Sequence, residues 1–184
     1  MLQQIVDDYL KLFPDDRKDL TLLLKQMSDG DVLNNRKTMP GHVTGSALVL
    51  SPDKTKILLI YHKLFNKWLQ PGGHWDPEDS NPRAAARREA VEETSVKIAK
   101  QLPAFGDNLQ VPLSISSHTI PARPEKQEAE HTHHDLRYVF LAADETLSHQ
   151  AEEVHAAAWF SFDAPECANI AYVIARIKKY VLER

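Results

Sequence analysis

The sequence predicts an α/β fold in which a mixed β-sheet lies between helices. Short apolar runs typical of strands alternate with turn residues between positions 42 and 162, and apolar residues recur at helical spacing before and after this region. The 184 residues, of which 42% are hydrophobic and 26% charged, suit one domain with a sizeable core. We therefore expect one domain with a helical extension.

The N-terminal residues are expected to form a helical hairpin. Apolar residues recur at i, i+3, i+4 and i+7 from Leu2 onward, and Pro14 ends this first helix because it cannot continue the hydrogen bonding. A second apolar stripe follows, and Gly30 ends it. The predicted organisation is an extension over residues 1–30, which serves packing or dimerisation, and a main domain over residues 31–184.

The main domain is expected to supply the sheet. Seven strands are predicted, at residues 42–50, 56–61, 68–70, 96–99, 109–118, 131–143 and 154–162. The Pro-Gly-Gly stretch at residues 71–73 predicts a tight turn, whose glycines accept positive φ and let a carbonyl approach a ligand. Asn81 and Pro82 are a typical N-cap and first residue for a following helix. An exposed loop is expected at residues 121–130 and a closing helix at residues 164–182.

Three carboxylates follow the glycine turn on one helical face. Glu89, Glu92 and Glu93 stand at i, i+3 and i+4, where side chains are roughly 5 to 6 Å apart and like charges repel. A hard divalent cation would relieve this repulsion, because Mg²⁺ and Mn²⁺ take oxygen ligands from carboxylates and substrate phosphates. A solvated helix face with an Arg88–Glu92 pair is the alternative. The glycine turn and the Asn-Pro helix start favour the metal site.

These residues resemble the Nudix box of the Nudix hydrolases, in a bacterial, MutT-like branch. The family pattern is G, five residues, E, seven residues and then R-E-U-x-E-E-x-G-U, where U is apolar. The box covers about residues 73–96, with Gly73 as its first position and residues 88–93 as the core of its second half. Asp79 stands where the family has Glu, one extra residue follows it, and Ser95 replaces the last glycine. No carboxylate of the R-E-x-x-E-E core is lost.

The resemblance implies an α/β/α sandwich and a pyrophosphohydrolase. Such an enzyme cleaves a nucleoside diphosphate linked to another group X by attack of water at phosphorus, assisted by Mg²⁺ or Mn²⁺. Glu89, Glu92 and Glu93 are then the expected metal ligands, with the carbonyl of Gly73 as a further one and one glutamate as general base. Arg88 is expected to orient a carboxylate by a charge-assisted hydrogen bond. The number of ions and the identity of the base stay open.

Further residues are candidates for substrate contact. They are Arg36, His62, Trp68, His74, His133, Arg137 and Glu152. Arg36 belongs to a basic pair with Lys37. His62, Trp68 and His74 flank the glycine turn in a pattern that also resembles the bacterial branch. Glu152 precedes the predicted strand at residues 154–162, and family members often add a carboxylate from a loop at such a position.

The predicted strand at residues 131–143 carries two of these candidates. Alternation places His131, His133, Asp135 and Arg137 on one face, while the opposite face is apolar. The polar face either lines the cleft, with a phosphate contact, or is solvated, and alternation fits both. A zinc site from His131, His133 and a carboxylate is a weaker alternative, because no paired cysteines accompany it.

The net charge limits the classes of partner that the protein is expected to bind. A net charge of −4 and a pI near 6.1 argue against nucleic acid as the main partner, whereas a small anionic nucleotide needs only a local positive patch. The sequence starts without a secretory signal or membrane span, so we expect a cytoplasmic protein, with a homodimer as a further expectation.

Two other functions were weighed against hydrolysis. A catalytically silent Nudix-fold nucleotide-binding or sensor module would have lost a carboxylate. The branch that isomerises isopentenyl diphosphate depends on a site cysteine, whereas the lone Cys167 belongs to the predicted closing helix. The nucleotide substrate itself stays open.

Overall fold

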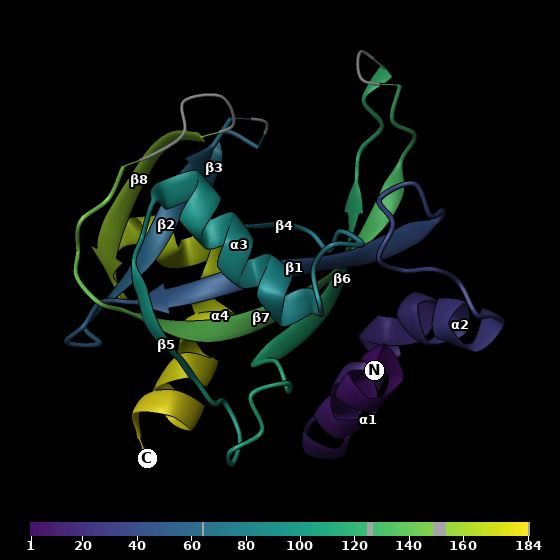
Figure 1. The fold of residues 1–184 in the computed structure, drawn as a ribbon, viewed down its shortest axis with the longest axis horizontal. Coiled ribbons are helices and arrows are strands. Elements are labelled where there is room, and N and C mark those ends of the chain that lie inside the picture. Colours follow the sequence, from purple (N-terminus) through teal and green to yellow (C-terminus); the bar gives the residue numbers. More distant parts are fainter. Residues whose placement is uncertain (64, 125–126, 149–153, 184) are drawn as a thin grey trace.

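The sheet predicted from the sequence forms the centre of the molecule (Figure 1). The computed structural model describes residues 1–63, 65–124, 127–148 and 154–183. Among them, eight strands form one mixed sheet with helices on its faces, which confirms the α/β class.

The strands are β1 (Gly41–Leu50), β2 (Lys56–His62), β3 (Lys67–Leu69), β4 (Gly72–His74), β5 (Ile98–Leu102), β6 (Ser114–Ile120), β7 (His131–Ala142) and β8 (Val154–Ser161). Their order is β3-β2-β1-β7-β5, with β4 paired to β1, β6 to β7 and β8 to β2. Strands β1 and β7 run parallel at the centre, and Gly41 to Leu50 face Thr132 to Leu141 in register. The other pairs are antiparallel. The central pairing joins segments 91 residues apart in sequence.

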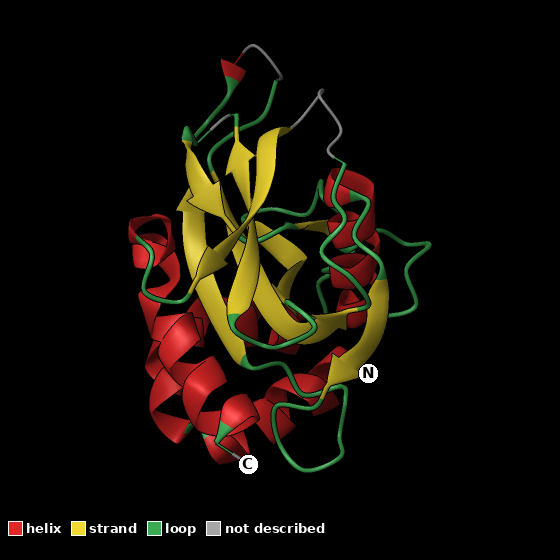
Figure 2. Cartoon of the chain, turned by 90° about the vertical axis from the view of Figure 1, so that its left-hand side faces the viewer, coloured by secondary structure: helices red, strands yellow, loops and turns green. Residues whose placement is uncertain are grey.

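The helices are α1 (Leu2–Leu12), the 3₁₀ helix η1 (Pro14–Leu20), α2 (Thr21–Asp29), α3 (Pro82–Thr94), the 3₁₀ helix η3 (Pro165–Ile170), α4 (Ala171–Ile177) and the π-helical turn η4 (Lys178–Leu182). Apolar side chains of α1, α2 and α3 share one core cluster with one face of the sheet. Those of η3 and α4 share a second cluster with the other face. Figure 2 shows the strands between helices on either side.

Several predicted boundaries were wrong. Residues 71–73 are not a turn, because β4 pairs with β1 there, and neither Gly72 nor Gly73 has positive φ. The strand expected at residues 109–118 begins later, since Asn108 accepts a hydrogen bond from the backbone N–H of residue 110 in a turn and a proline follows. The closing helix is divided into 3₁₀, α and π segments.

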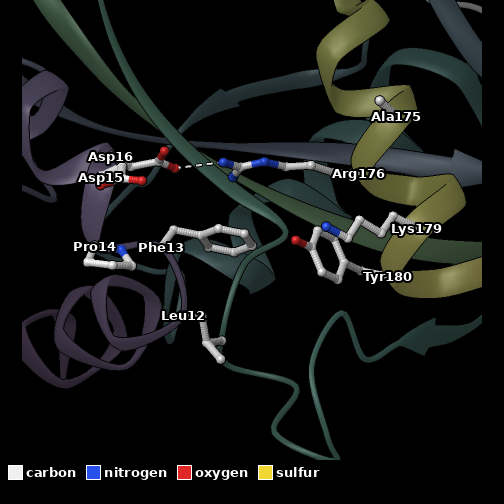
Figure 3. A pocket seen from close by; sticks show the side chains of 9 residues that line it. All are labelled: Leu12, Phe13, Pro14, Asp15, Asp16, Ala175, Arg176, Lys179 and Tyr180. Atoms are coloured by element: carbon white, nitrogen blue, oxygen red, sulfur yellow. Dashed lines mark hydrogen bonds and ion pairs between the residues drawn. The ribbon is translucent and has the colours of Figure 1, made fainter.

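The N-terminal segment packs against the closing helix. Arg176 of α4 pairs with Asp16 at 2.8 Å and donates to the hydroxyl of Tyr9 at 2.7 Å. Its guanidinium lies 4.1 Å from the centre of the Phe13 ring. Phe13, Asp16 and Arg176 line a cavity of about 370 Å³, and Figure 3 shows their side chains with the ion pair between Asp16 and Arg176. No helix of the described residues is long and apolar enough to cross a membrane.

Candidate functional site

A cleft of about 1250 Å³ is lined by polar side chains from several strands and helices around the centre of the sheet. It is lined by parts of β1, β4, α3, β6, β7 and α4. Its acidic wall includes Glu89, Glu92 and Glu93, which we call the carboxylate centre. The cationic side chains that also line it are Arg36, Lys63, Lys67, Arg123, Arg137 and Arg176. Opposite charges therefore meet across one cavity.

The helix that carries the carboxylate centre has the ends the sequence predicts. Asn81 caps α3, because its side-chain oxygen accepts a hydrogen bond from the backbone N–H of Ala84 at 2.9 Å. Pro82 is the first helical residue. Ser95 ends the helix in the left-handed region, with φ 54° and ψ 19°, where the family pattern has glycine.

Arg88 connects the loop before α3 to the carboxylate centre. It donates from Nε and Nη2 to both oxygens of Asp79, at 3.1 and 2.8 Å, and from Nη1 to Glu89 at 2.8 Å and Glu92 at 3.0 Å. It also donates to the carbonyl of His74 at 3.0 Å. The hydrogen bonds with Asp79 and the nearby negative charges raise the pKa of the Arg88 guanidinium. Arg88 thus forms hydrogen bonds with three carboxylates.

Asp79 stands where the family pattern has the longer glutamate, and it contacts Arg88. Despite its shorter side chain and the extra residue that follows, it accepts both Arg88 hydrogen bonds in a fork geometry. The backbone of Asp79 accepts from Trp75 Nε1 at 3.0 Å, and its Oδ2 accepts from the N–H of Asp76 at 3.2 Å. The loop is therefore folded around this carboxylate.

Strand β4 lies directly against the carboxylate centre. The N–H of Gly72 donates to Glu93 Oε2 at 3.0 Å, and Glu93 is only 6% exposed. A Cβ at Gly73 would overlap the carboxylate of Glu89. Glycine is thus needed at 73 for close approach, rather than for the positive φ we expected. Glu92 differs from its neighbours, since half of its side chain is exposed.

Two histidines from the sequence prediction line the cleft. His74 follows Gly73 on β4, and His133 lies on β7. Burial lowers the pKa of His74 to about 3 and that of His133 to about 2, because a charged ring would lose its hydration. Both rings are therefore neutral near pH 7.

Arg137 also lines the cleft, but it is buried and paired. It forms an ion pair with Asp135 at 3.0 Å and donates to Ser116 at 2.9 Å and to the hydroxyl of Tyr172 at 2.6 Å. Ser46 donates to Asp135 at 2.8 Å from the neighbouring strand. The polar face of β7 is thus part of the cleft wall and is not a solvated surface.

The remaining predicted contacts lie in different places. Arg36 lines the cleft and pairs with Glu128 at 3.3 Å, and His62 also lines it. The Trp68 ring packs against Tyr61 and Phe160 instead, so the structure does not bring it to the cleft. Glu152 lies outside the described residues.

Sequence reasoning missed His42. This histidine is 1% exposed on β1, and its neighbour in the parallel register is His133. Periodicity along one strand cannot reveal a partner on another strand 91 residues away. Only the strand order brings the two together.

Comparisons with known proteins agree with this architecture. The sequence pattern of the NUDIX domain family matches residues 41–181. A NUDIX family hydrolase from Clostridium perfringens is 22% identical, with 75% of this chain and 97% of that chain covered and a TM-score of 0.53. An Ap4A hydrolase from C. elegans, solved as a binary complex, is 14% identical over 77% and 98% of the two chains, with a TM-score of 0.52. A NUDIX hydrolase from Nitrosomonas europaea is 21% identical over 77% and 88%, with a TM-score of 0.51. Among curated proteins, none matches the chain.

Proposed function

Because the chain belongs to the NUDIX domain family, we propose that it is a metal-dependent hydrolase of nucleoside diphosphates linked to another group X. The bond cleaved is the pyrophosphate linkage. Family membership and the shared fold support an enzyme of the pyrophosphohydrolase type.

The carboxylate centre is the observation that carries this proposal. Three glutamates of one helix border a cleft. Arg88 donates hydrogen bonds to Glu89 and Glu92, but it shares its charge with Asp79. A phosphate could not approach these carboxylates without further positive charge. Oxygen donors are what Mg²⁺ and Mn²⁺ prefer, so the residues present fit such an ion.

Glu89, Glu92 and Glu93 would hold the Mg²⁺ or Mn²⁺, with the backbone of Gly73 beside them. When bound, the ion neutralises phosphate charge and lowers the pKa of a bound water. One glutamate accepts a proton from the attacking water, the new bond forms between that oxygen and phosphorus, and the bond to the bridging oxygen breaks. Arg88 holds Glu89 and Glu92 in position during these steps.

The opposite wall suits an anionic nucleotide. Lys67 and Arg36 line it and can pair with phosphate oxygens. The rings of Phe65 and Tyr172 border the same cavity and offer flat surfaces for a nucleobase. His62, His74, His133 and Arg137 complete the proposed substrate-binding set.

The N-terminal residues would support this site without entering the chemistry. We propose that residues 1–30 form an extension that packs against a catalytic domain of residues 31–184. The predicted homodimer stays a prediction.

A screen of product release over a nucleotide panel tests the proposal. Nucleotide sugars, ADP-ribose, dinucleoside polyphosphates and oxidised nucleotides would be incubated with Mg²⁺ or Mn²⁺, and the products separated by ion-exchange chromatography. We expect hydrolysis of at least one compound, and its loss when a chelator is added. Tight nucleotide binding without turnover under any metal condition would instead favour the silent binding module.

A further inference from the structure

A group of histidines at the cleft takes no part in the chemical steps of the hydrolysis proposed above, where His74 and His133 serve only for substrate contact. The ring centroids of His42, His131 and His133 are 4.9 to 5.0 Å apart in each of the three pairs. His74 lies 5.1 Å from His42 and 5.2 Å from His133. We call His42, His131 and His133 the histidine cluster.

The strand topology explains why these rings meet. His131 and His133 are two residues apart on β7, so their side chains leave the same face of the sheet. His42 faces His133 across the parallel β1–β7 pairing. Antiparallel β4 adds His74 on the other side of β1, opposite Thr44. Three strands therefore direct imidazoles toward one region.

Hydrogen bonds to the backbone orient two of the rings. Nδ1 of His131 lies 2.8 Å from the carbonyl oxygen of Ala129, and Nδ1 of His42 lies 3.3 Å from that of Thr38. A carbonyl oxygen only accepts, so in both rings Nδ1 carries the hydrogen and a neutral Nε2 keeps its lone pair. This arrangement, in which one nitrogen donates to a carbonyl and leaves the other as a ligand, is the usual one for metal-bound histidine.

Nε2 of His131 and Nε2 of His133 form a hydrogen bond with each other, which a metal ion bound by both rings would replace. Nε2 of His131 lies 3.1 Å from Nε2 of His133, close to the roughly 3.4 Å separation of two ligands on one tetrahedral ion. Nε2 of His42 is buried and has no hydrogen-bond partner among the described residues, and the residue is only 1% exposed. An unsatisfied buried acceptor is costly, and a metal ion would satisfy it.

We propose that His42, His131 and His133 form a binding site for a divalent transition-metal ion, with Zn²⁺ as the prime candidate. One ligand atom from each ring lies within 4.8 Å of the others, so small side-chain rotations bring all three onto one ion. His133 lines the cleft and gives the ion a path of entry.

The donor chemistry separates this site from the carboxylate centre. Neutral imidazoles suit Zn²⁺, Ni²⁺, Co²⁺ or Cu²⁺, whereas Mg²⁺ prefers charged or carbonyl oxygens. The cluster carries no negative charge of its own. A large excess of Mg²⁺ should therefore fill the carboxylate centre and leave the histidine cluster to Zn²⁺.

Metal binding to the stripped protein tests the site. Chelator-treated protein would be titrated with Zn²⁺ in excess Mg²⁺ without nucleotide, and bound zinc measured by elemental analysis after dialysis. We expect one Zn²⁺ per chain in the wild type and in Glu92→Gln. In His133→Gln the affinity should fall by at least about 100-fold, since a direct ligand is lost. The exposed His155 on β8 supplies the matched control, His155→Gln, which should bind like the wild type.

A second measurement needs no variant. Co²⁺ bound by three imidazoles in the wild type should give the intense visible absorption of a tetrahedral site, which oxygen ligands do not give. Equal Zn²⁺ affinity in wild type and a folded His133→Gln, checked by circular dichroism, would overturn the proposal. So would a Co²⁺ spectrum typical of octahedral oxygen coordination. Neither result depends on whether the protein hydrolyses a nucleotide.

Discussion

The carboxylate centre lines the cleft that the histidine cluster reaches through His133, yet the two groups are built in opposite ways. The glutamates come from consecutive turns of α3 and carry charge that Arg88 only partly balances. The histidines come from β1 and β7, and the buried ring of His133 stays neutral. Charged oxygen donors attract hard cations whatever else is present, whereas neutral nitrogen donors select by the nature of the metal.

We therefore expect the two groups to act separately, the carboxylate centre on turnover and the histidine cluster on zinc binding. A change on the α3 side should alter turnover without altering zinc binding. A change at His42 or His131, which lie outside the proposed substrate-binding set, should do the reverse. The following predictions test that separation from the largest expected effect to the smallest.

Removing one charge from the carboxylate centre should have the largest effect. We expect Glu92→Gln to lower kcat by about 10² to 10⁴-fold, because a metal ligand or general base is lost. Its side chain is half exposed, so the fold should tolerate the amide. Steady-state kinetics on the best substrate measures the change. The exposed Glu78→Gln serves as control, and equal losses in both variants would contradict a specific role.

Adding one methyl group beside the centre should have the next largest effect. Gly73→Ala would push the Glu89 carboxylate aside, and we expect kcat to fall by roughly tenfold or more, since small displacements of positioned groups are costly. Gly30→Ala is the matched control, because Gly30 has φ 81° and open space around it. It should lower stability by about 1 kcal/mol and leave kcat unchanged. Unaltered kinetics in Gly73→Ala would show that Glu89 need not lie where it does.

His134, which lies on the face of β7 opposite the histidine cluster, should give the protein a pH dependence of stability. His134 contacts Gln26 of α2 and Ser117 of β6, and burial lowers its pKa to about 4. In the unfolded chain His134 binds a proton near pH 6.5, whereas in the folded chain it does so only near pH 4. Its contribution to the free energy of unfolding is therefore complete above pH 6.5 and is lost as the pH falls toward 4. The loss should approach about 3 kcal/mol.

Urea unfolding at a series of pH values measures this slope. His134→Gln should make the free energy of unfolding fall less steeply between pH 6.5 and 4, whatever its effect at neutral pH. An identical slope in both proteins would exclude His134 as a source. Glu78→Gln again provides the comparison.

The smallest effect is expected at the end of α3. Ser95 holds φ 54°, which costs most residues about 1 to 2 kcal/mol, and glycine adopts it freely. Part of that gain is lost to the greater freedom of glycine in the unfolded chain, so Ser95→Gly should stabilise by roughly 0.5 kcal/mol. Thermal and denaturant melts measure it. A loss of stability would mean that the serine side chain makes a contact worth more than the strain.

Local patterns in the sequence predicted the α3 side well. The cap at Asn81, the start at Pro82 and the i, i+3, i+4 spacing of the glutamates involve residues within a few positions of each other. The metal and catalytic roles of these glutamates are proposals that the experiments above address. The α/β class was also predictable, because each strand and helix carries its own periodicity.

Long-range pairing could not be predicted in the same way. The glycines at 72 and 73 were interpreted as a turn because their pairing with β1 is invisible along the chain. Trp68 was expected at the cleft but packs on Phe160, a residue of another strand. His42 gained its significance only from the parallel partner β7. In each case the missing information was strand order.

The parallel pairing of β1 and β7 also affects how the chain folds while it is being synthesised. All ten residues of β1 are buried in the folded protein, yet β7 leaves the ribosome about ninety residues later. Until then the nascent chain has an apolar strand with one edge unpaired, a template for association with other chains. We therefore expect the newborn protein to need chaperone protection from the moment β1 emerges until residue 142 has been made, and to be prone to aggregation if translation stalls in between.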